Sequence, residues 1–82
     1  MIRISDPAKL GQTLGTLRIT NGWTRAALAR ELAARNGSTH ETALLNLWRW
    51  DTGRAHPDPR SLGHYLAALG YDLALIPRED TP

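Results

Sequence analysis

Three polar side chains recur at helical spacing in the middle of the chain. They are Thr42, Asn46 and Arg49, four and three positions apart, which places them on one side of a helix at about 100° per residue. A guanidinium, an amide and a hydroxyl with its methyl group can pair with the edges of guanine, adenine and thymine respectively. The pattern therefore indicates a helix face able to contact the polar edges of nucleotide bases. A merely solvated face, which also collects polar residues, stays open as the alternative.

The surrounding segment carries its own start and stop signals. Ser38 precedes Glu41 by three positions, the spacing of a capping box in which the hydroxyl accepts a backbone N–H and the carboxylate returns a bond to the cap. Gly53 can adopt the left-handed conformation that ends a helix. We predict a helix over residues 39–52, with Leu45 beside the polar side chains. The opposite face carries the residues expected in the core, namely Ala43, Leu44, Leu47 and Trp50.

Other residue types that could carry out chemistry lack the partners they would need. The chain has no cysteine, which removes disulfides and thiolate zinc sites. His40, His56 and His64 do not form a two-histidine-plus-carboxylate spacing, so we expect no metal and no cofactor. The sequence contains no glycine-rich phosphate loop and no serine with a histidine and an acid in a catalytic pattern. An enzyme is therefore the least favoured class.

Composition limits the size of the fold and the kind of partner. Eighty-two residues, 41% of them hydrophobic, suit one domain over residues 1–82 with a small core. No apolar run reaches membrane-spanning length, and the first residues lack the pattern of a signal peptide, so we expect a cytoplasmic protein. The net charge is +2, and nine of the ten basic residues are arginine, which suits phosphate and guanine contacts. A GC-rich genome would also favour arginine.

Cap and stop residues divide the chain into four expected helices. The start signals are Asp6-Pro7, Thr24 and Asp58-Pro59. The stop signals are Asn21-Gly22, Asn36-Gly37 and Gly70. These signals predict helices over residues 7–21, 25–35, 39–52 and 59–69. Gly11 and Gly15 weaken the first helix, so it must depend on tertiary contacts or allow another element to approach closely.

The segment after the last helix reads as a short β-strand over residues 71–76, ending before Pro77. A lone strand leaves its backbone hydrogen bonds unpaired. It therefore requires Met1–Ile4, its own copy in a second subunit, or both. We assign a role in dimerisation to Leu73, Leu75 and Ile76.

Four groups of residues, in this order along the chain, match the pattern of a known family. The first is Leu10, Leu14, Leu17 and Arg18 followed by Asn21-Gly22-Trp23-Thr24. The second is Leu28-Ala29 with Leu32, the third is Trp50-Asp51-Thr52-Gly53-Arg54, and the fourth is Pro57 with Leu62, Leu66 and Leu69-Gly70. Over residues 10–70 the chain resembles the XRE/Cro-type helix-turn-helix regulators, which include phage Cro-like proteins and small antitoxin-type repressors.

The resemblance implies a mainly α, lambda-repressor-like bundle of four or so helices whose third helix enters the DNA major groove. The chain departs from the family between its second and third helices, where the interval is longer and Ala33 replaces a turn glycine. Alignment backwards from Trp50 would place Leu44 and Leu45 at base-contacting positions. Because leucine cannot read a hydrogen-bond pattern, we follow the helical-face argument, with Leu45 against a thymine methyl.

The expected function is sequence-specific binding of double-stranded DNA by a small transcriptional repressor that acts as a homodimer on a palindromic operator. We assign base contacts to Thr42, Leu45, Asn46, Arg49 and His40. We assign phosphate contacts to Thr24, Arg25, Ser38, Thr39, Arg54 and Arg60. The alternative is a protein-interaction module, an antitoxin or adaptor, that binds a partner protein through Ile19, Leu45 and Trp48.

Overall fold

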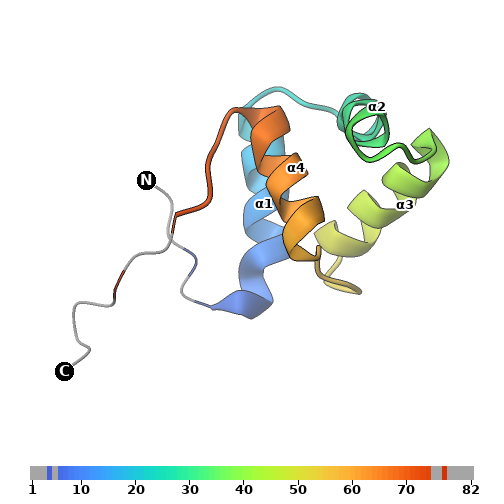
Figure 1. Ribbon diagram of the computed structural model, residues 1–82. Helices are drawn as coiled ribbons and strands as arrows, with labels where there is room; N and C mark the ends of the chain where they lie inside the picture. Colours follow the sequence, from blue (N-terminus) through green and yellow to red (C-terminus); the bar gives the residue numbers. More distant parts are fainter. Residues whose placement is uncertain (1–3, 5, 75–76, 78–82) are drawn as a thin grey trace.

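The regular structure in the described part of the chain is helical, in agreement with the mainly α bundle expected from the sequence. The computed structural model describes residues 4, 6–74 and 77. A short 3-10 turn, η1 (Pro7–Lys9), leads into α1 (Leu10–Thr20), which is followed by α2 (Arg25–Asn36), α3 (His40–Asp51) and α4 (Pro59–Leu69). α2 packs against both α3 and α4, and α1 packs against α3. Figure 1 shows α2 and α3 together on the side of the bundle away from both chain ends.

Two helices begin at the caps expected from the sequence. The side chain of Thr24 accepts a hydrogen bond from the backbone N–H of Ala27 at 3.1 Å. Asp58 caps α4 by accepting from the backbone N–H of Ser61 at 2.7 Å, and Pro59 occupies the first turn. These bonds satisfy N–H groups that a helix start otherwise leaves without a partner.

The start of α3 differs from the expected capping box. Its cap is Thr39, whose hydroxyl oxygen accepts from the backbone N–H of Thr42 at 3.1 Å and whose O–H donates to the hydroxyl oxygen of Thr42 at 2.9 Å. Ser38 belongs instead to the end of α2, where its N–H donates to the carbonyl of Ala33 at 3.0 Å. The predicted pairing of Ser38 with Glu41 is therefore wrong, because the end of the preceding helix already determines the conformation of Ser38.

α1 and α3 approach one another at a glycine. A Cβ atom on Gly11 would overlap the backbone carbonyl oxygen of Trp50, and one on Gly15 would lie 3.1 Å from Oδ1 of Asp51. Gly11 and Gly15 weaken α1 as an isolated helix, but they allow α3 to approach it closely, which is one of the two roles expected for them from the sequence.

Among the described residues, twelve from α1, α2, α3 and α4 form the hydrophobic core: Leu14, Leu17, Leu28, Ala29, Leu32, Ala33, Ala43, Leu47, Trp50, Tyr65, Leu66 and Leu69. Tyr65 is fully buried, and its hydroxyl donates to the carbonyl oxygen of Leu14 at 2.9 Å. Its ring lies 6.2 Å from that of Trp50, centroid to centroid. These contacts of Tyr65 connect α4 with α1 and α3.

The predicted C-terminal strand is not observed in residues 71–74, which form no regular element. Leu75 and Ile76, and Met1 to Arg3 of the expected partner segment, lie outside the described residues. Gly70 ends α4 with φ 86°, and the hydroxyl of Tyr71 accepts from Nδ2 of Asn21 at 3.2 Å. The segment leaves the bundle on the side of α1 (Figure 1). Residues 71–74 have no neighbouring strand in the described structure to complete a ladder.

No helix in the described part of the chain combines the length and the apolar character needed to cross a membrane.

Candidate nucleic-acid interface

The solvent-facing side of α3 carries two adjacent stripes of side chains. The polar stripe contains Thr42 and Arg49, both exposed, with the half-buried Asn46 at its edge. The apolar stripe contains Leu44 and Trp48, which are 37% and 40% exposed. At about 100° per residue, Leu45 lies on the boundary between the two stripes, and it is 46% exposed.

The exposure of Leu44 corrects the expectation that it belongs to the core. Ala43, Leu47 and Trp50 are buried as predicted. At about 100° per residue these three lie within about 60° of one another, whereas Leu44 lies about 60° from Leu47 and about 100° or more from Ala43 and Trp50. α1, α2 and α4 cover an arc of α3 centred near Ala43, and Leu44 lies beyond the edge of that arc marked by Leu47.

The polar stripe has hydrogen-bonding groups that remain available to a ligand. Within the described structure no carboxylate lies in salt-bridge distance of Arg49, and its side chain is exposed. The Thr42 hydroxyl accepts from Thr39, which leaves the hydrogen of Thr42 free to donate. The structure therefore brings Thr42, Asn46 and Arg49 together on one surface, as the spacing predicts.

His40 does not join this stripe. It is half-buried at the start of α3, and its Nδ1 is buried without a hydrogen-bond partner among the described residues. By helical projection His40 points toward the same side as Leu47. The position of His40 therefore does not support the expected base contact. His40 lies on the same side of α3 as the core residue Leu47, so its side chain turns partly toward the core.

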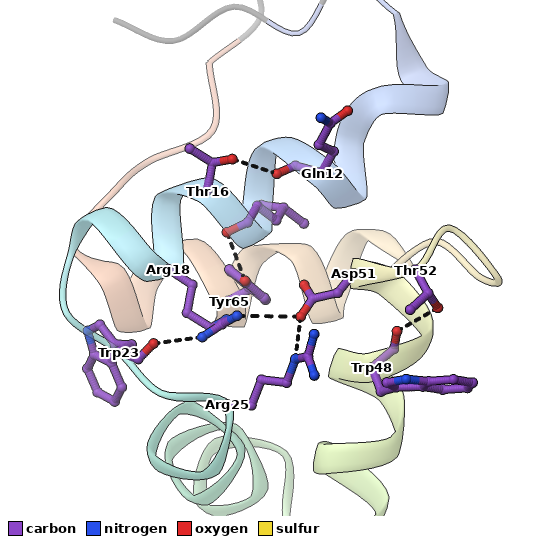
Figure 2. Close-up of polar contacts among 10 residues, drawn as sticks. Gln12, Thr16, Arg18, Trp23, Arg25, Trp48, Asp51, Thr52 and Tyr65 are labelled. Atoms are coloured by element: carbon purple, nitrogen blue, oxygen red, sulfur yellow. Dashed lines mark hydrogen bonds and ion pairs between the residues drawn. The ribbon is translucent and has the colours of Figure 1, made fainter.

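The start of α2 is joined to the end of α3 by a partly buried network (Figure 2). Oδ2 of Asp51 accepts from Nε of Arg25 at 2.7 Å and lies 3.6 Å from Nη2 of Arg18. Nη1 of Arg18 donates to the carbonyl oxygen of Trp23 at 2.8 Å. The Asp51 side chain is 9% exposed and that of Arg18 10% exposed. Two cations therefore surround one nearly buried carboxylate.

Arg25 is the exposed member of that network. Its side chain is 45% exposed, and only Nε is engaged by Asp51 within the described structure. The two terminal nitrogens remain available to an anion at the first turn of α2, where the helix dipole also favours negative charge. The pairing with Asp51 was not predicted from the sequence. A possible signal was Arg18, a charged residue one turn after Leu14 on the buried face of α1.

Tyr65 completes the surroundings of Asp51. Burial raises the pKa of Tyr65 to about 12, and the negative charge of Asp51 contributes in the same direction. The phenol is therefore neutral near pH 7 and acts as a hydrogen-bond donor to Leu14. This arrangement is suited to holding α4 against α1, and it provides no acid or base near neutral pH.

The other expected phosphate-contacting residues are exposed at helix ends. Thr24 and Thr39 use their hydroxyls as caps, and Ser38 is exposed beside Thr39. The remaining two, Arg54 and Arg60, are exposed near either end of the loop between α3 and α4. At the start of α4 the hydrogen bond from the backbone of Ser61 lowers the pKa of Asp58, with a smaller contribution from the charge of Arg60.

An open groove runs beside the apolar stripe. Its volume is about 460 Å³, and it is lined by Arg25, Glu41, Leu44, Leu45 and Trp48. The periodicity of α3 does not predict this groove, because the groove depends on how the start of α2 lies next to α3.

The residues assigned to dimerisation are only partly described. Leu73 is 63% exposed, while Leu75 and Ile76 lie outside the described residues. Ile19 is 67% exposed on α1. Among the described residues no cluster of three or more histidine, aspartate or glutamate side chains is arranged to hold a metal ion.

A scan against models of protein families gives no match to this chain, and searches of curated proteins and of solved structures give none either.

Proposed function

We propose that the protein binds double-stranded DNA by placing α3 in the major groove, as a lambda-repressor-like domain of the XRE/Cro type. The observation that carries this proposal is the polar stripe of α3, in which Thr42 and Arg49 are exposed and Asn46 is half-buried. The order of the helices and the resemblance over residues 10–70 support it. α3 is 12 residues long, or about 18 Å, which suits a groove about 12 Å wide.

In the proposed complex the polar stripe reads base edges. Arg49 donates two parallel hydrogen bonds to guanine, Asn46 pairs with adenine, and Thr42 donates to a base acceptor. Leu45, at the boundary of the stripes, contacts a thymine methyl group. The buried face of α3 is held by Leu47 and Trp50, so the reading side chains start from a rigid support.

Phosphates are held by groups at the edges of this surface. Arg25 presents its terminal nitrogens while Asp51 holds its Nε. Thr24 and Thr39 mark the starts of α2 and α3, where N–H groups and helix dipoles favour an anion. Arg54 and Arg60 extend the basic edge past the end of α3. Phosphate contacts of this kind fix register and orientation without selecting sequence.

As a dimer, the protein would present two copies of α3 about one helical turn of DNA apart, and the operator would be palindromic. Occupancy of such a site by a small protein blocks transcription, which makes repression the expected outcome. Exposed Leu73 is the described residue available for the contact between subunits.

The groove of Leu44, Leu45 and Trp48 favours a second candidate function, the binding of a partner protein. Three large apolar side chains exposed side by side are typical of a docking surface. Such a module would act as an antitoxin or adaptor, and its binding would survive raised salt because apolar burial carries little charge.

Selection of bound fragments from a pool of random duplexes, followed by mass measurement of the complex, tests the leading proposal. We expect enrichment of a two-fold symmetric motif and two chains per duplex. Enrichment of no sequence, together with failure to retain any duplex in dilute salt, would exclude DNA binding and leave the groove as the candidate site.

A further inference from the structure

The side chain of Arg54 lies across the indole of Trp48. The guanidinium carbon is 4.5 Å from the centre of the ring, within the range of a cation–π contact. Trp48 stands on the outer side of α3 and is 40% exposed, and Arg54 is exposed as well. This contact is therefore at the surface, on the apolar stripe of α3, and not part of the core.

The backbone brings Arg54 back over α3 after the helix has ended. Gly53 has φ 76°, a left-handed conformation that reverses the chain. The N–H of Arg54 then donates to the carbonyl oxygen of Arg49 at 2.9 Å. This bond holds the backbone of Arg54 against the last turn of α3, and the stack with the indole orients the rest of the side chain.

No carboxylate among the described residues lies within salt-bridge distance of Arg54. When one face of a guanidinium rests on an aromatic ring, its N–H groups still point outward in the plane. An arginine held this way keeps its full charge and has already lost the side-chain freedom that binding would otherwise remove. Arg49, also exposed, has no such aromatic support in the described structure.

We propose that Trp48 is a positioning residue, which holds the guanidinium of Arg54 ready to bind a phosphate of the DNA backbone. This inference rests on the proposed function, because the anion is the phosphate of a duplex bound along α3. Trp48 itself touches no phosphate. Leu47 and Trp50 of α3 are buried in the core, whereas Trp48 is exposed. Support of Arg54 explains why a tryptophan lies on this outer side of the helix.

The proposal is tested with the full chain and a mixed-sequence DNA duplex, because a phosphate contact does not depend on base sequence. Affinity is measured over a series of salt concentrations for wild type, Trp48→Leu, Trp48→Phe and Arg54→Ala. We expect Arg54→Ala to reduce the salt slope by about one. Trp48→Leu, which keeps apolar bulk, should lower affinity about two- to fivefold and reduce the slope in the same direction. Trp48→Phe should recover most of the loss.

The double variant Trp48→Leu/Arg54→Ala separates support of Arg54 from a direct role of Trp48. We expect it to bind like Arg54→Ala alone, because Trp48 acts only through Arg54. The proposal would be overturned if Trp48→Leu lowered the affinity for DNA as much in the Arg54→Ala variant as in wild type. It would also be overturned if Trp48→Leu alone left the affinity and the salt slope unchanged. Thermal unfolding of each variant checks that the fold is retained.

A measurement without DNA distinguishes failure of this inference from failure of the proposed function. Ring current from the indole should shift the NMR signals of the Arg54 side chain in wild type, and Trp48→Leu should remove that shift. If the shift is absent, the support of Arg54 by Trp48 is wrong even where DNA binds. If the shift is present but wild type binds no duplex in dilute salt, both the DNA-binding function and the phosphate role fail.

Discussion

Asp51, the last residue of α3, accepts a 2.7 Å hydrogen bond from Nε of Arg25, the first residue of α2. The same carboxylate oxygen lies 3.6 Å from Nη2 of Arg18 on α1. One nearly buried side chain therefore connects three helices. It also holds Nε of Arg25 beside the groove lined by Leu44, Leu45 and Trp48.

Asp51→Ala should destabilise the protein strongly, by about 3–5 kcal/mol, because it leaves the buried Arg18 without its anion. Chemical denaturation measures the change. Glu31→Ala is the matched control, since Glu31 pairs with Arg35 at 2.9 Å on the surface and its loss should cost no more than about 0.5 kcal/mol. Equal effects of the two substitutions would contradict a structural role for Asp51.

Gly11→Ala and Gly63→Ala should change stability in opposite directions. Alanine favours a helix by up to about 1 kcal/mol over glycine, and Gly63 has open space around the added Cβ. At Gly11 the Cβ would overlap the carbonyl oxygen of Trp50, so we expect a net loss of about 1–3 kcal/mol. Melting temperatures provide the comparison, and stabilisation by both substitutions would show that α1 and α3 are not in close contact.

Thr39→Ala should cost about 1 kcal/mol of stability, because the hydroxyl oxygen of Thr39 caps α3. Ser38→Ala should have little effect, since the described contact of Ser38 is made by its backbone N–H. Urea denaturation of both variants distinguishes the observed cap from the capping box expected from the sequence. A larger loss for Ser38→Ala would favour the capping box.

Stability should fall at high pH through Tyr65. Burial raises the pKa of Tyr65 from 10.0 to about 12 in the folded protein, so the unfolded chain loses this proton first. The contribution of Tyr65 is fully present below pH 10 and is lost as the pH rises toward 12, at a slope of up to about 1.4 kcal/mol per pH unit. Tyrosinate absorbance of the Tyr71→Phe variant reports Tyr65 alone, because the chain has two tyrosines. Half-ionisation near pH 10 in the folded protein would disprove this shift.

Arg49→Ala should weaken binding to the selected duplex by about 1–3 kcal/mol and relax preference at one base pair. Arg35→Ala is the control, because it removes the same charge from a side chain already held by Glu31. Affinities for the selected and a scrambled duplex measure both effects. The docking of α3 is wrong if Arg49→Ala binds every duplex as wild type does.

Local signals in the sequence were sufficient for the positions of the helices. Caps such as Thr24 and Asp58 and left-handed glycines such as Gly70 act through backbone groups within a few residues, so their effects can be predicted without the rest of the fold. The periodicity of α3 likewise identified its polar stripe and its buried residues. It also placed Leu44 in the core, but the structure leaves Leu44 exposed.

Contacts between helices were decided only by the tertiary structure. The sharing of Asp51 by Arg18 and Arg25, the groove beside Leu44, and the half-buried place of His40 each depend on which helix covers which arc of α3. Helical periodicity predicts which side chains share a face of α3, but it does not predict how wide an arc of α3 the other helices cover. That width follows from the close approach of α1 at Gly11 and the packing of α2 and α4, which involve residues far apart in the chain.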